Sequence, residues 1–424
     1  MTMSRAQLRH LALRLRQDGW GQVARHGTAK AATFLQERWG LAEPELPLRP
    51  EDVADPSDPA VQRGSVQRGS VQRPEVPFPG KQAPLNIGWV CTPPGPGSGG
   101  HTTLFRMVHA MEERGHRCTL FLYDRTSDDV SRHEPVIRRH WPNISAEVRS
   151  ATDGMAGMDA LVASSWSSAH VIAARAPRQP HVFYFIQDYE PYFHPRGILY
   201  ALAEDSYRFG YTTVALGDMI AQVMKAELGT PPDAVVPYGC DTTTYRLLPT
   251  TGAWQRTGVV YYAKRNVDRR GYLLAKLALE RFHQLCPDKE IHVYGDIVSG
   301  WKIPITNHGN LPPRELNILY NHTIAGLAIS FTNISLVPGE LLAAGNVPVL
   351  NQAPFASGLL TDPDAVWAPS RPDSLATALA EVVCSPNIQE RAARIGSSQR
   401  LDWSATAEAF GNLMQESLVG QGPA

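Results

Sequence analysis

Short apolar runs alternate with helix-like stretches from Leu85 to about residue 418. Runs of about four to eight residues rich in Val, Phe and Tyr are typical of buried strands. The first set of predicted strands covers 85–91, 118–124, 160–164, 181–188 and 212–217. After a Pro-containing stretch at 230–238 the pattern restarts, and the second set covers 258–264, 291–296, 324–330 and 347–352.

Helices are predicted between these strands, at 102–114, 168–175, 271–286, 312–320, 338–345 and 372–384, and a last helix at 403–418. Alternation of strands and helices indicates parallel sheets with right-handed crossovers. Two such sets predict an α/β protein with two doubly wound, Rossmann-like domains that face a cleft. We place them at 81–245 and 246–402, followed by a C-terminal helix and tail at 403–424. Ligands of such sheets bind at the carboxyl ends of the strands.

The first 80 residues have a different character. Residues 1–40 are basic, and Leu8, Leu11 and Leu15 share one helical face. Such a helix either lies on an anionic membrane surface or packs against protein. Residues 41–80 are rich in Pro and acidic residues and contain a VQRGS repeat from Val61 to Arg73, which is typical of a flexible linker.

Composition narrows the function classes. The 424 residues include 40 Lys and Arg against 41 Asp and Glu, a balance that argues against a nucleic-acid binder. Five Cys without a CxxC pair fit reduced thiols and not a disulfide framework or a zinc site. No apolar run is long enough to span a bilayer. We therefore expect a cytoplasmic protein, with residues 1–40 as the candidate peripheral contact to the inner face of the cell membrane.

A glycine-rich loop follows the first predicted strand. Gly95, Gly97 and Gly100 match G-x-G-x-x-G, which makes an NAD(P)-dependent oxidoreductase an alternative. Three residues separate the strand from the first glycine, and Pro96 removes one of the N–H donors that should cradle a pyrophosphate. Gly99 and Gly100 still open a helix, where phosphate or sugar can approach bare backbone.

Two further segments carry candidate ligand contacts in the second domain. The first strand of this domain is followed by four cationic residues, Lys264, Arg265, Arg269 and Arg270. They suggest a site that clamps a diphosphate, and the alternative is a solvent-exposed loop. After the strand at 324–330, Thr332, Asn333 and Ser335 can donate to phosphates. Glu340 is the lone acid of this block and can accept from ribose hydroxyls, or else only complement the helix dipole.

Residues 85–418 resemble the GT-B glycosyltransferases of family 4, and within them the WsaF-type bacterial rhamnosyltransferases. The resemblance is carried by the GGH loop and by FIQDYEPYF (185–193), YAKRNVDRRGY (262–272) and TNISLVPGELLAAGNVPV (332–349). It implies that Arg265 or Lys264 and Arg270 hold the diphosphate, Glu340 holds the ribose, and the Gly99 and Gly100 amides approach the donor. It also implies dTDP-β-L-rhamnose as donor and a saccharide as acceptor, for which a lipid-linked saccharide is one candidate.

One departure from the family pattern is informative. That pattern has a second Glu eight positions before Glu340, where this sequence has Thr332. The change disfavours a glucose- or mannose-type donor and agrees with a 6-deoxy sugar. It is also the one feature that favours a non-catalytic sugar-binding module. A sugar-nucleotide 2-epimerase has the same architecture and stays open as well.

The acid–base candidates lie in the first domain. Asp188 follows a strand and can orient or deprotonate the acceptor, or else cap the next segment. We assign catalysis to Asp188, His101 and Arg265, and acceptor binding to Tyr189, Glu190 and Tyr192, although these aromatics are equally credible as core residues. Positive charge can stabilise the diphosphate leaving group without a metal, so we expect no metal and no cofactor.

Overall fold

The computed structural model describes residues 46–62, 84–178, 180–249, 255–334, 336–356, 360 and 362–419. The predicted helix at 1–40, most of the VQRGS repeat, Ser335 and the tail at 420–424 lie outside these residues. The chain divides into Met1–Pro47 and a compact unit, Leu48–Ala424, to which all the elements below belong.

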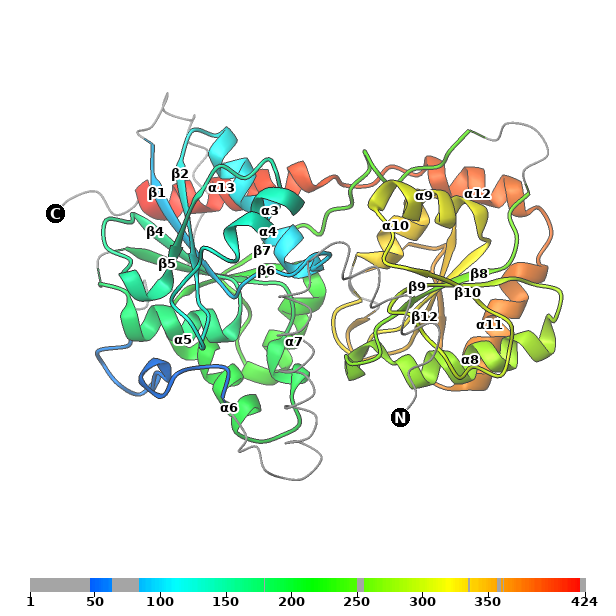
Figure 1. Ribbon diagram of the computed structural model, residues 1–424, viewed down its shortest axis with the longest axis horizontal. Coiled ribbons are helices and arrows are strands. Elements are labelled where there is room, and N and C mark those ends of the chain that lie inside the picture. The colour runs from blue at the N-terminus through cyan, green and yellow to red at the C-terminus, as the bar shows by residue number, and fades with distance from the viewer. Residues whose placement is uncertain are drawn as a thin grey trace. The chain divides into compact units, whose positions relative to one another are not determined.

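The first sheet has seven parallel strands in the order β3-β2-β1-β4-β5-β6-β7 (Figure 1). The strands are β1 (Asn86–Cys91), β2 (Arg117–Leu122), β3 (Glu147–Ser150), β4 (Ala160–Ala163), β5 (His181–Ile186), β6 (Thr212–Leu216) and β7 (Ala234–Val236). The connecting helices are α3 (Gly99–Glu113), α4 (Glu134–His140), α5 (Trp166–Arg175), α6 (Ile198–Asp205) and α7 (Asp218–Leu228). The order reverses between β1 and β4, as in a doubly wound sheet.

The second sheet has six parallel strands in the order β10-β9-β8-β11-β12-β13. The strands are β8 (Val259–Ala263), β9 (Ile291–Gly295), β10 (Thr306–Gly309), β11 (Ala325–Ala328), β12 (Val347–Asn351) and β13 (Val366–Ala368). The helices are α8 (Tyr272–Leu285), α9 (Pro313–His322), α10 (Val337–Ala343), α11 (Pro372–Cys384) and α12 (Ile388–Ser397). The two predicted doubly wound sheets are thus confirmed.

The last helix, α13 (Trp403–Val419), belongs to the core of the first sheet (Figure 1). The ring of Phe410 is completely buried, and its centroid lies 5.9 Å from that of Trp89 and 5.2 Å from that of Phe185. The chain therefore returns to its first domain after the second domain is complete. We predicted this helix as a separate segment, whereas it completes the first domain's hydrophobic core.

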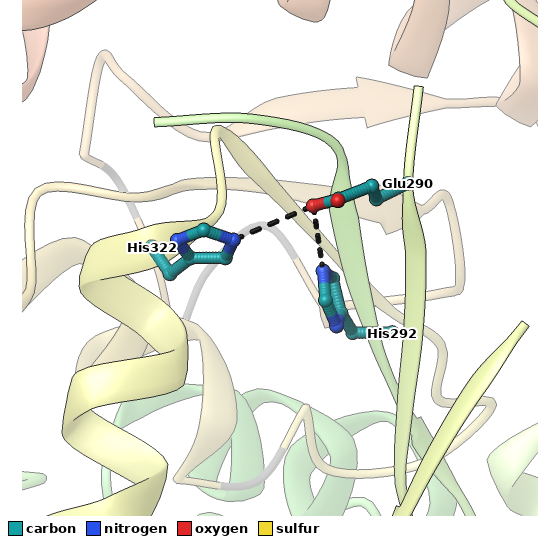
Figure 2. Close-up of side chains that lie close together, drawn as sticks. All are labelled: Glu290, His292 and His322. Carbon is teal, nitrogen blue, oxygen red and sulfur yellow. Dashed lines mark hydrogen bonds and ion pairs between the residues drawn. The ribbon is translucent and has the colours of Figure 1, made fainter. Parts of the chain in front are cut away.

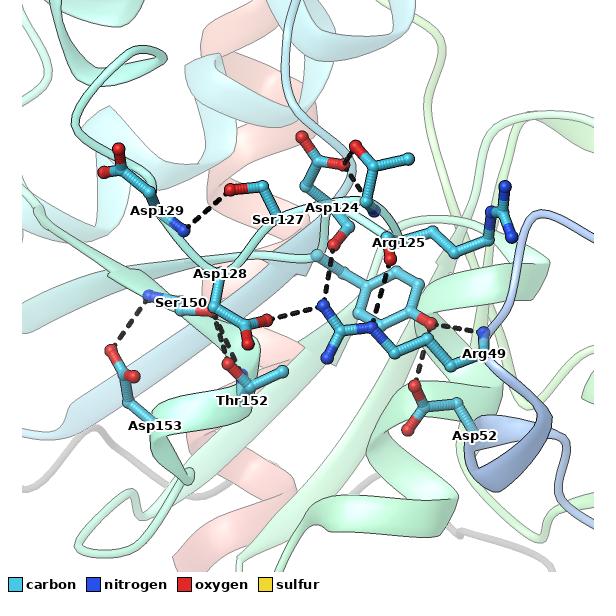
Figure 3. A network of polar contacts seen from close by, with 12 residues as sticks. Arg49, Asp52, Asp124, Arg125, Ser127, Asp128, Asp129, Ser150, Thr152 and Asp153 are labelled. Atoms are coloured by element: carbon cyan, nitrogen blue, oxygen red, sulfur yellow. Dashed lines mark hydrogen bonds and ion pairs between the residues drawn. The ribbon is translucent and has the colours of Figure 1, made fainter.

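Part of the predicted linker is packed structure. Asp52, in a short 3-10 helix at Pro50–Asp52, is fully buried and accepts a 2.8 Å hydrogen bond from the Tyr123 hydroxyl. Its second partner is the guanidinium of Arg175 in α5. Arg49 pairs with Asp128 at 2.6 Å (Figure 3). The prediction of a linker throughout 41–80 is therefore wrong for residues 48–62, which fold onto the first domain. Among the described residues, no helix has both the length and the apolar character to cross a membrane.

Candidate functional site

Hydrogen bonds join the carboxyl ends of the two sheets. Gln187 and Asp188 follow β5, and Thr332 and Asn333 follow β11. The Thr332 hydroxyl donates to Asp188 Oδ2 at 2.8 Å, and the Asn333 N–H donates to Oδ1 at 3.3 Å. The Asn333 side-chain amide donates to the Gln187 carbonyl at 2.6 Å. Residues predicted as donor-binding and as catalytic therefore meet directly.

Asp188 is a buried carboxyl group at this junction, with 8 % of the residue exposed. Burial raises the pKa of Asp188, while Arg270, the Thr332 hydroxyl and Arg269 act in the opposite direction. A buried carboxylate needs such partners, because loss of hydration disfavours the charged form. Burial and the neighbouring cations and donors thus act in opposite directions on the pKa of Asp188.

Arg270 organises the segment after β11. Its Nη1 donates to Ser330 Oγ at 2.9 Å and to the Asn333 carbonyl at 2.7 Å. Gly271 makes this approach possible: its φ is +59°, and a Cβ there would lie 2.4 Å from Ile329 Cγ2. Glycine at position 271 thus lets the loop after β8 pack closely against the loop after β11. This packing holds the Arg270 guanidinium in one orientation.

Arg269 is a residue that the sequence did not single out among the four cations. Its guanidinium carbon lies 3.8 Å from the centroid of the Phe193 ring, so it reaches across to the first domain. Its Nε is buried and has no hydrogen-bond partner among the described residues. Burial and the neighbouring charge of Arg270 lower the pKa of Arg269, while Asp188 and Glu190 act in the opposite direction. An unpaired cationic N–H here can bind an anion.

The predicted clamp is divided into two pairs. Lys264 and Arg265 lie beside Asp296, which follows β9. The backbone N–H of Arg265 donates to Asp296 Oδ2 at 2.8 Å, and Lys264 Nζ lies 4.0 Å from Oδ1. An open pocket on this side is lined by Arg265, Asn266, Asp268, Tyr272 and Leu273. Arg269 and Arg270 instead face Asp188. Among the described residues, the two pairs do not contact each other, so the four cations do not form a single clamp.

The amino end of α3 carries Gly99 and Gly100, and open space surrounds the position of a Gly99 Cβ. Gln187 Nε2 donates to the Gly100 carbonyl at 3.1 Å, which places this helix end beside the Asp188 loop. The first-turn N–H groups of a 15-residue helix form a favourable anion site. The bare backbone expected at these glycines is therefore present.

Both ring nitrogens of His101 form hydrogen bonds within this loop. Nδ1 lies 2.7 Å from Ser98 Oγ, and Nε2 lies 2.9 Å from the Thr92 carbonyl. The geometry makes Nε2–H the donor to Thr92 and leaves Nδ1 to accept from Ser98. Burial lowers the pKa of His101. Both nitrogens are thus engaged inside the loop, which favours a structural role over the catalytic one that we predicted.

Glu340 lies in α10, where burial raises its pKa to about 8 and Arg106 acts against that shift. Tyr320 likewise acts to lower the pKa of Glu340. Arg106, from α3, donates to Asp241 at 3.2 Å and lies 5.0 Å from the Trp403 ring. Glu340 is therefore a half-buried acid close to Arg106, a cation of the first domain. Its environment includes this cation as well as the dipole of its own helix.

Tyr238 is a further residue near this site, and no pattern in the sequence pointed to it. It follows β7 (Ala234–Val236), and its ring packs against Trp403. Burial raises the pKa of Tyr238, and the charges of Arg270, Glu340 and Asp188 all act on its hydroxyl. Residues predicted for the diphosphate, the ribose and catalysis therefore all lie close enough to act electrostatically on this phenol.

The predicted acceptor residues have different settings. Tyr189 is 1 % exposed and stacks on Tyr207 at 5.3 Å, so it is a core residue and not an accessible sugar platform. Glu190 Oε2 accepts from the Trp166 N–H at 2.5 Å and so binds the first turn of α5, whose N-cap is Ser165; this contact was not predicted. Tyr192 is half-buried and donates to Glu227 at 2.7 Å.

The loop geometry disfavours the dinucleotide interpretation. In a dinucleotide fingerprint the third glycine allows close packing of helix and strand. A Cβ on Gly100 would meet only Gln187 Oε1, at 3.8 Å. A dinucleotide fingerprint also places an acid after the next strand to bind the ribose. Asp124, which follows β2, would be that acid, and it already binds Arg132, His133 and Thr126.

Comparison with known proteins agrees with this architecture. The O-antigen biosynthesis protein RfbC of Myxococcus xanthus is 27 % identical over 330 residues, which cover 72 % of this chain. The chain spans 25 % of the length of RfbC. No family model matches the sequence.

Solved structures decide the fold. Alr3699/HepE of Anabaena, in complex with UDP-glucose, matches with a TM-score of 0.61 at 15 % identity, over 78 % of this chain and all of HepE. WaaG, a glycosyltransferase involved in lipopolysaccharide biosynthesis, matches with a TM-score of 0.55 at 12 % identity, over 77 % of this chain and 99 % of WaaG. The chain has the GT-B fold. The predicted architecture is thereby confirmed, and at these identities the likeness concerns the fold alone.

Proposed function

We propose that the chain is a nucleotide-sugar glycosyltransferase of polysaccharide or O-antigen assembly. The observation that carries the proposal is the meeting of Asp188 with Thr332 and Asn333, because it brings the ligand-binding ends of two parallel sheets together. The likeness to RfbC, an O-antigen biosynthesis protein, and to HepE, which binds UDP-glucose, supports the same activity.

The donor diphosphate is proposed to bind between the amino end of α3 and the cationic loop after β8. Arg265, Lys264 and Arg270 offset its charge, as do the Gly99 and Gly100 amides. Negative charge grows on the leaving diphosphate as the glycosidic bond breaks, and fixed cations stabilise that charge most in a partly dry site. In this proposal no metal ion is needed for transfer.

Glu340 is proposed to bind the ribose, and Asn333 and Ser335 to contribute phosphate contacts. Half-buried, Glu340 can accept from a ribose hydroxyl when ionised and can donate when protonated. Its raised pKa makes both forms accessible near neutral pH.

The proposed donor sugar is L-rhamnose, carried as dTDP-β-L-rhamnose. Thr332 stands where the family pattern has an acid, and its hydroxyl contacts Asp188 of the first domain at 2.8 Å. Asp188 therefore brings a carboxylate to within hydrogen-bonding distance of the substituted position. We propose that it serves the donor sugar or the acceptor hydroxyl there, as general base or as orienting group.

The acceptor is proposed to be a saccharide, lipid-linked in the cell, and the protein to act in the cytoplasm. Peripheral membrane contact through residues 1–40 is part of this proposal. Tyr192 and Glu190 remain acceptor candidates at the rim of the Asp188 loop, whereas Tyr189 contributes through packing.

Calorimetric titration with dTDP, UDP, GDP and NAD, each in EDTA, tests the donor. We expect dTDP to bind most tightly. Preferential UDP or GDP binding would overturn rhamnose and keep the transferase, and NAD binding alone would overturn the transferase. Product analysis with dTDP-rhamnose and short rhamnosides then follows: a 2-epimerase needs no acceptor, and a non-catalytic module binds the donor without turnover.

A further inference from the structure

A second cluster of polar side chains lies at the amino ends of the strands of the second sheet. Glu290 immediately precedes β9, His292 is the second residue of that strand, and His322 is the last residue of α9, which leads into β11. All three therefore lie at the amino ends of parallel strands. The site described above lies at the carboxyl ends, so the two are separate.

The three side chains point their metal-binding atoms toward one another (Figure 2). Glu290 Oε2 lies 3.3 Å from His292 Nε2 and 3.4 Å from His322 Nε2. Ligand atoms about 2.0–2.2 Å from a tetrahedral Zn²⁺ are separated from one another by about 3.3–3.5 Å. The observed oxygen–nitrogen separations match the edges of such a tetrahedron, and all three ligand atoms lie within 4.8 Å of one another.

A fourth residue fixes the orientation of one imidazole. His292 Nδ1 lies 3.0 Å from Nε2 of His308, which comes from β10. Histidines that bind a metal through one nitrogen almost always donate the other N–H to a neighbour. If His292 Nδ1–H donates to His308, then His292 Nε2 presents its lone pair toward Glu290, where only a cation or a proton can satisfy both groups.

The burial of the cluster suits an ion that enters from solvent. His292 is 8 % exposed and anchors the inner side. The side chain of Glu290 is 54 % exposed and that of His322 is 30 % exposed, so the outer side is open and a water molecule can take a fourth position. Two imidazoles and a carboxylate suit Zn²⁺ and its transition-metal neighbours far better than Mg²⁺ or Ca²⁺.

We propose that Glu290, His292 and His322 bind one Zn²⁺, with His308 positioning His292. The ion would tie the start of β9 to the end of α9 and stabilise the second domain, because it binds the folded chain and holds three ligands from two elements. The proposal is independent of the proposed transferase activity, since the donor site lies at the other end of the strands.

The test uses the full chain, prepared without an oligohistidine tag and stripped with EDTA before dialysis. Zn²⁺ is titrated calorimetrically, Tm is measured with and without Zn²⁺, and Co²⁺ is added as a spectroscopic probe. We expect one ion per chain, a higher Tm with Zn²⁺, and the visible absorption of tetrahedral Co²⁺. His322→Gln and Glu290→Gln should each lower Zn²⁺ affinity by at least about tenfold, with His308→Phe in the same direction.

His283→Gln is the matched control, because this histidine lies in α8 of the same domain and outside the cluster. It should bind Zn²⁺ as the unaltered chain does. The proposal is overturned if the unaltered chain fails to bind one Zn²⁺ saturably, or if affinity survives in both ligand variants. Equal loss in His283→Gln would also overturn it. The Co²⁺ spectrum of the unaltered chain keeps the test decisive even where a variant folds poorly.

Discussion

The Thr332 hydroxyl donates a 2.8 Å hydrogen bond to the Asp188 carboxylate, and this bond joins the two domains at their ligand-binding ends. Both residues are buried, so water cannot replace the donor if it is lost. The contact places a carboxylate of the first domain next to Thr332 of the second.

Thr332→Val removes this donor and keeps the shape. We expect the free energy of unfolding to fall by about 1.5–3 kcal/mol, the range for a hydrogen bond to a charged group. The pKa of Asp188 should rise further, because one of the groups that lower it is gone. Urea denaturation and the pH profile of transfer check both. Thr126→Val is the control, since Thr126 is exposed and bonds Asp124 at 2.7 Å; an equal loss there would contradict the argument.

Arg270→Gln and Glu340→Gln should each weaken dTDP binding by about tenfold or more, since a charge-assisted hydrogen bond contributes about 1.5–3 kcal/mol. Calorimetric titration measures the change. Arg394→Gln removes a surface cation that pairs with Asp364 and should leave the affinity unchanged. Unaltered dTDP affinity in both site variants would show that the nucleotide binds elsewhere.

Glu190 should make stability depend on pH. Burial raises its pKa from 4.5 to about 8. The unfolded chain loses this proton near pH 4.5, whereas the folded chain keeps it, so the contribution of Glu190 is complete below pH 4.5 and is lost as pH rises through 8. Glu190→Gln keeps an acceptor for the Trp166 N–H and cannot ionise.

We therefore expect Glu190→Gln to gain stability relative to the unaltered chain as pH rises from 5 to 8, by up to about 1.4 kcal/mol per pH unit. Urea denaturation at several pH values measures the difference. Parallel curves for the two proteins would mean that Glu190 is ionised in the folded state throughout this range.

Asp52→Ala should destabilise the first domain by about 3 kcal/mol, because it leaves Arg175 and the Tyr123 hydroxyl without their buried partner. The free energy of unfolding from urea titration is the measurement. Asp55→Ala is the control: Asp55 is exposed and bonds only Ser57 among its described side-chain partners. A change below about 1 kcal/mol for Asp52→Ala would show that residues 48–62 are dispensable.

Phe410→Ala should cost about 3–5 kcal/mol of stability, as expected for a large aromatic removed from a core. The loss should appear in the unfolding of the first domain although position 410 follows the second domain in sequence. Leu401→Ala, at a side chain that is 58 % exposed, should change little. Similar small effects from both substitutions would argue that α13 does not complete that core.

The strands that the sequence predicts are the buried ones. β1 and β5 are continuous apolar runs because helices cover both faces of a parallel sheet. The four edge strands in the described part of the chain were all missed: β3 (EVRS), β7 (AVV), β10 (TNHG) and β13 (VWA). Each has only three or four residues, some of them partly exposed, which is too short for a periodic pattern. An edge strand forms because a neighbouring strand pairs with it. That partner is distant in sequence, so the local pattern does not indicate the pairing.

The residues of the candidate site also fall into two groups, those that the sequence pointed to and those that it did not. Arg270 and Glu340 stood out because a cationic loop and a lone acid follow apolar strands, and topology places such residues at a ligand edge. The Asp188–Thr332 contact was beyond reach, because 144 positions separate the two residues. Arg269 on Phe193 and the setting of Tyr238 likewise depend on how two domains meet. Tyr189 and Tyr192 look alike in sequence, and only packing separates the core residue from the rim residue.

The return of α13 to the first domain has a consequence for synthesis on the ribosome. The aromatic surface formed by Trp89, Phe183 and Phe185 lacks its cover until Phe410 has been translated. The second domain can close while the first still shows an apolar face to the cell. We expect nascent chains that end before α13 to engage chaperones through that face, and to release them once the last helix emerges.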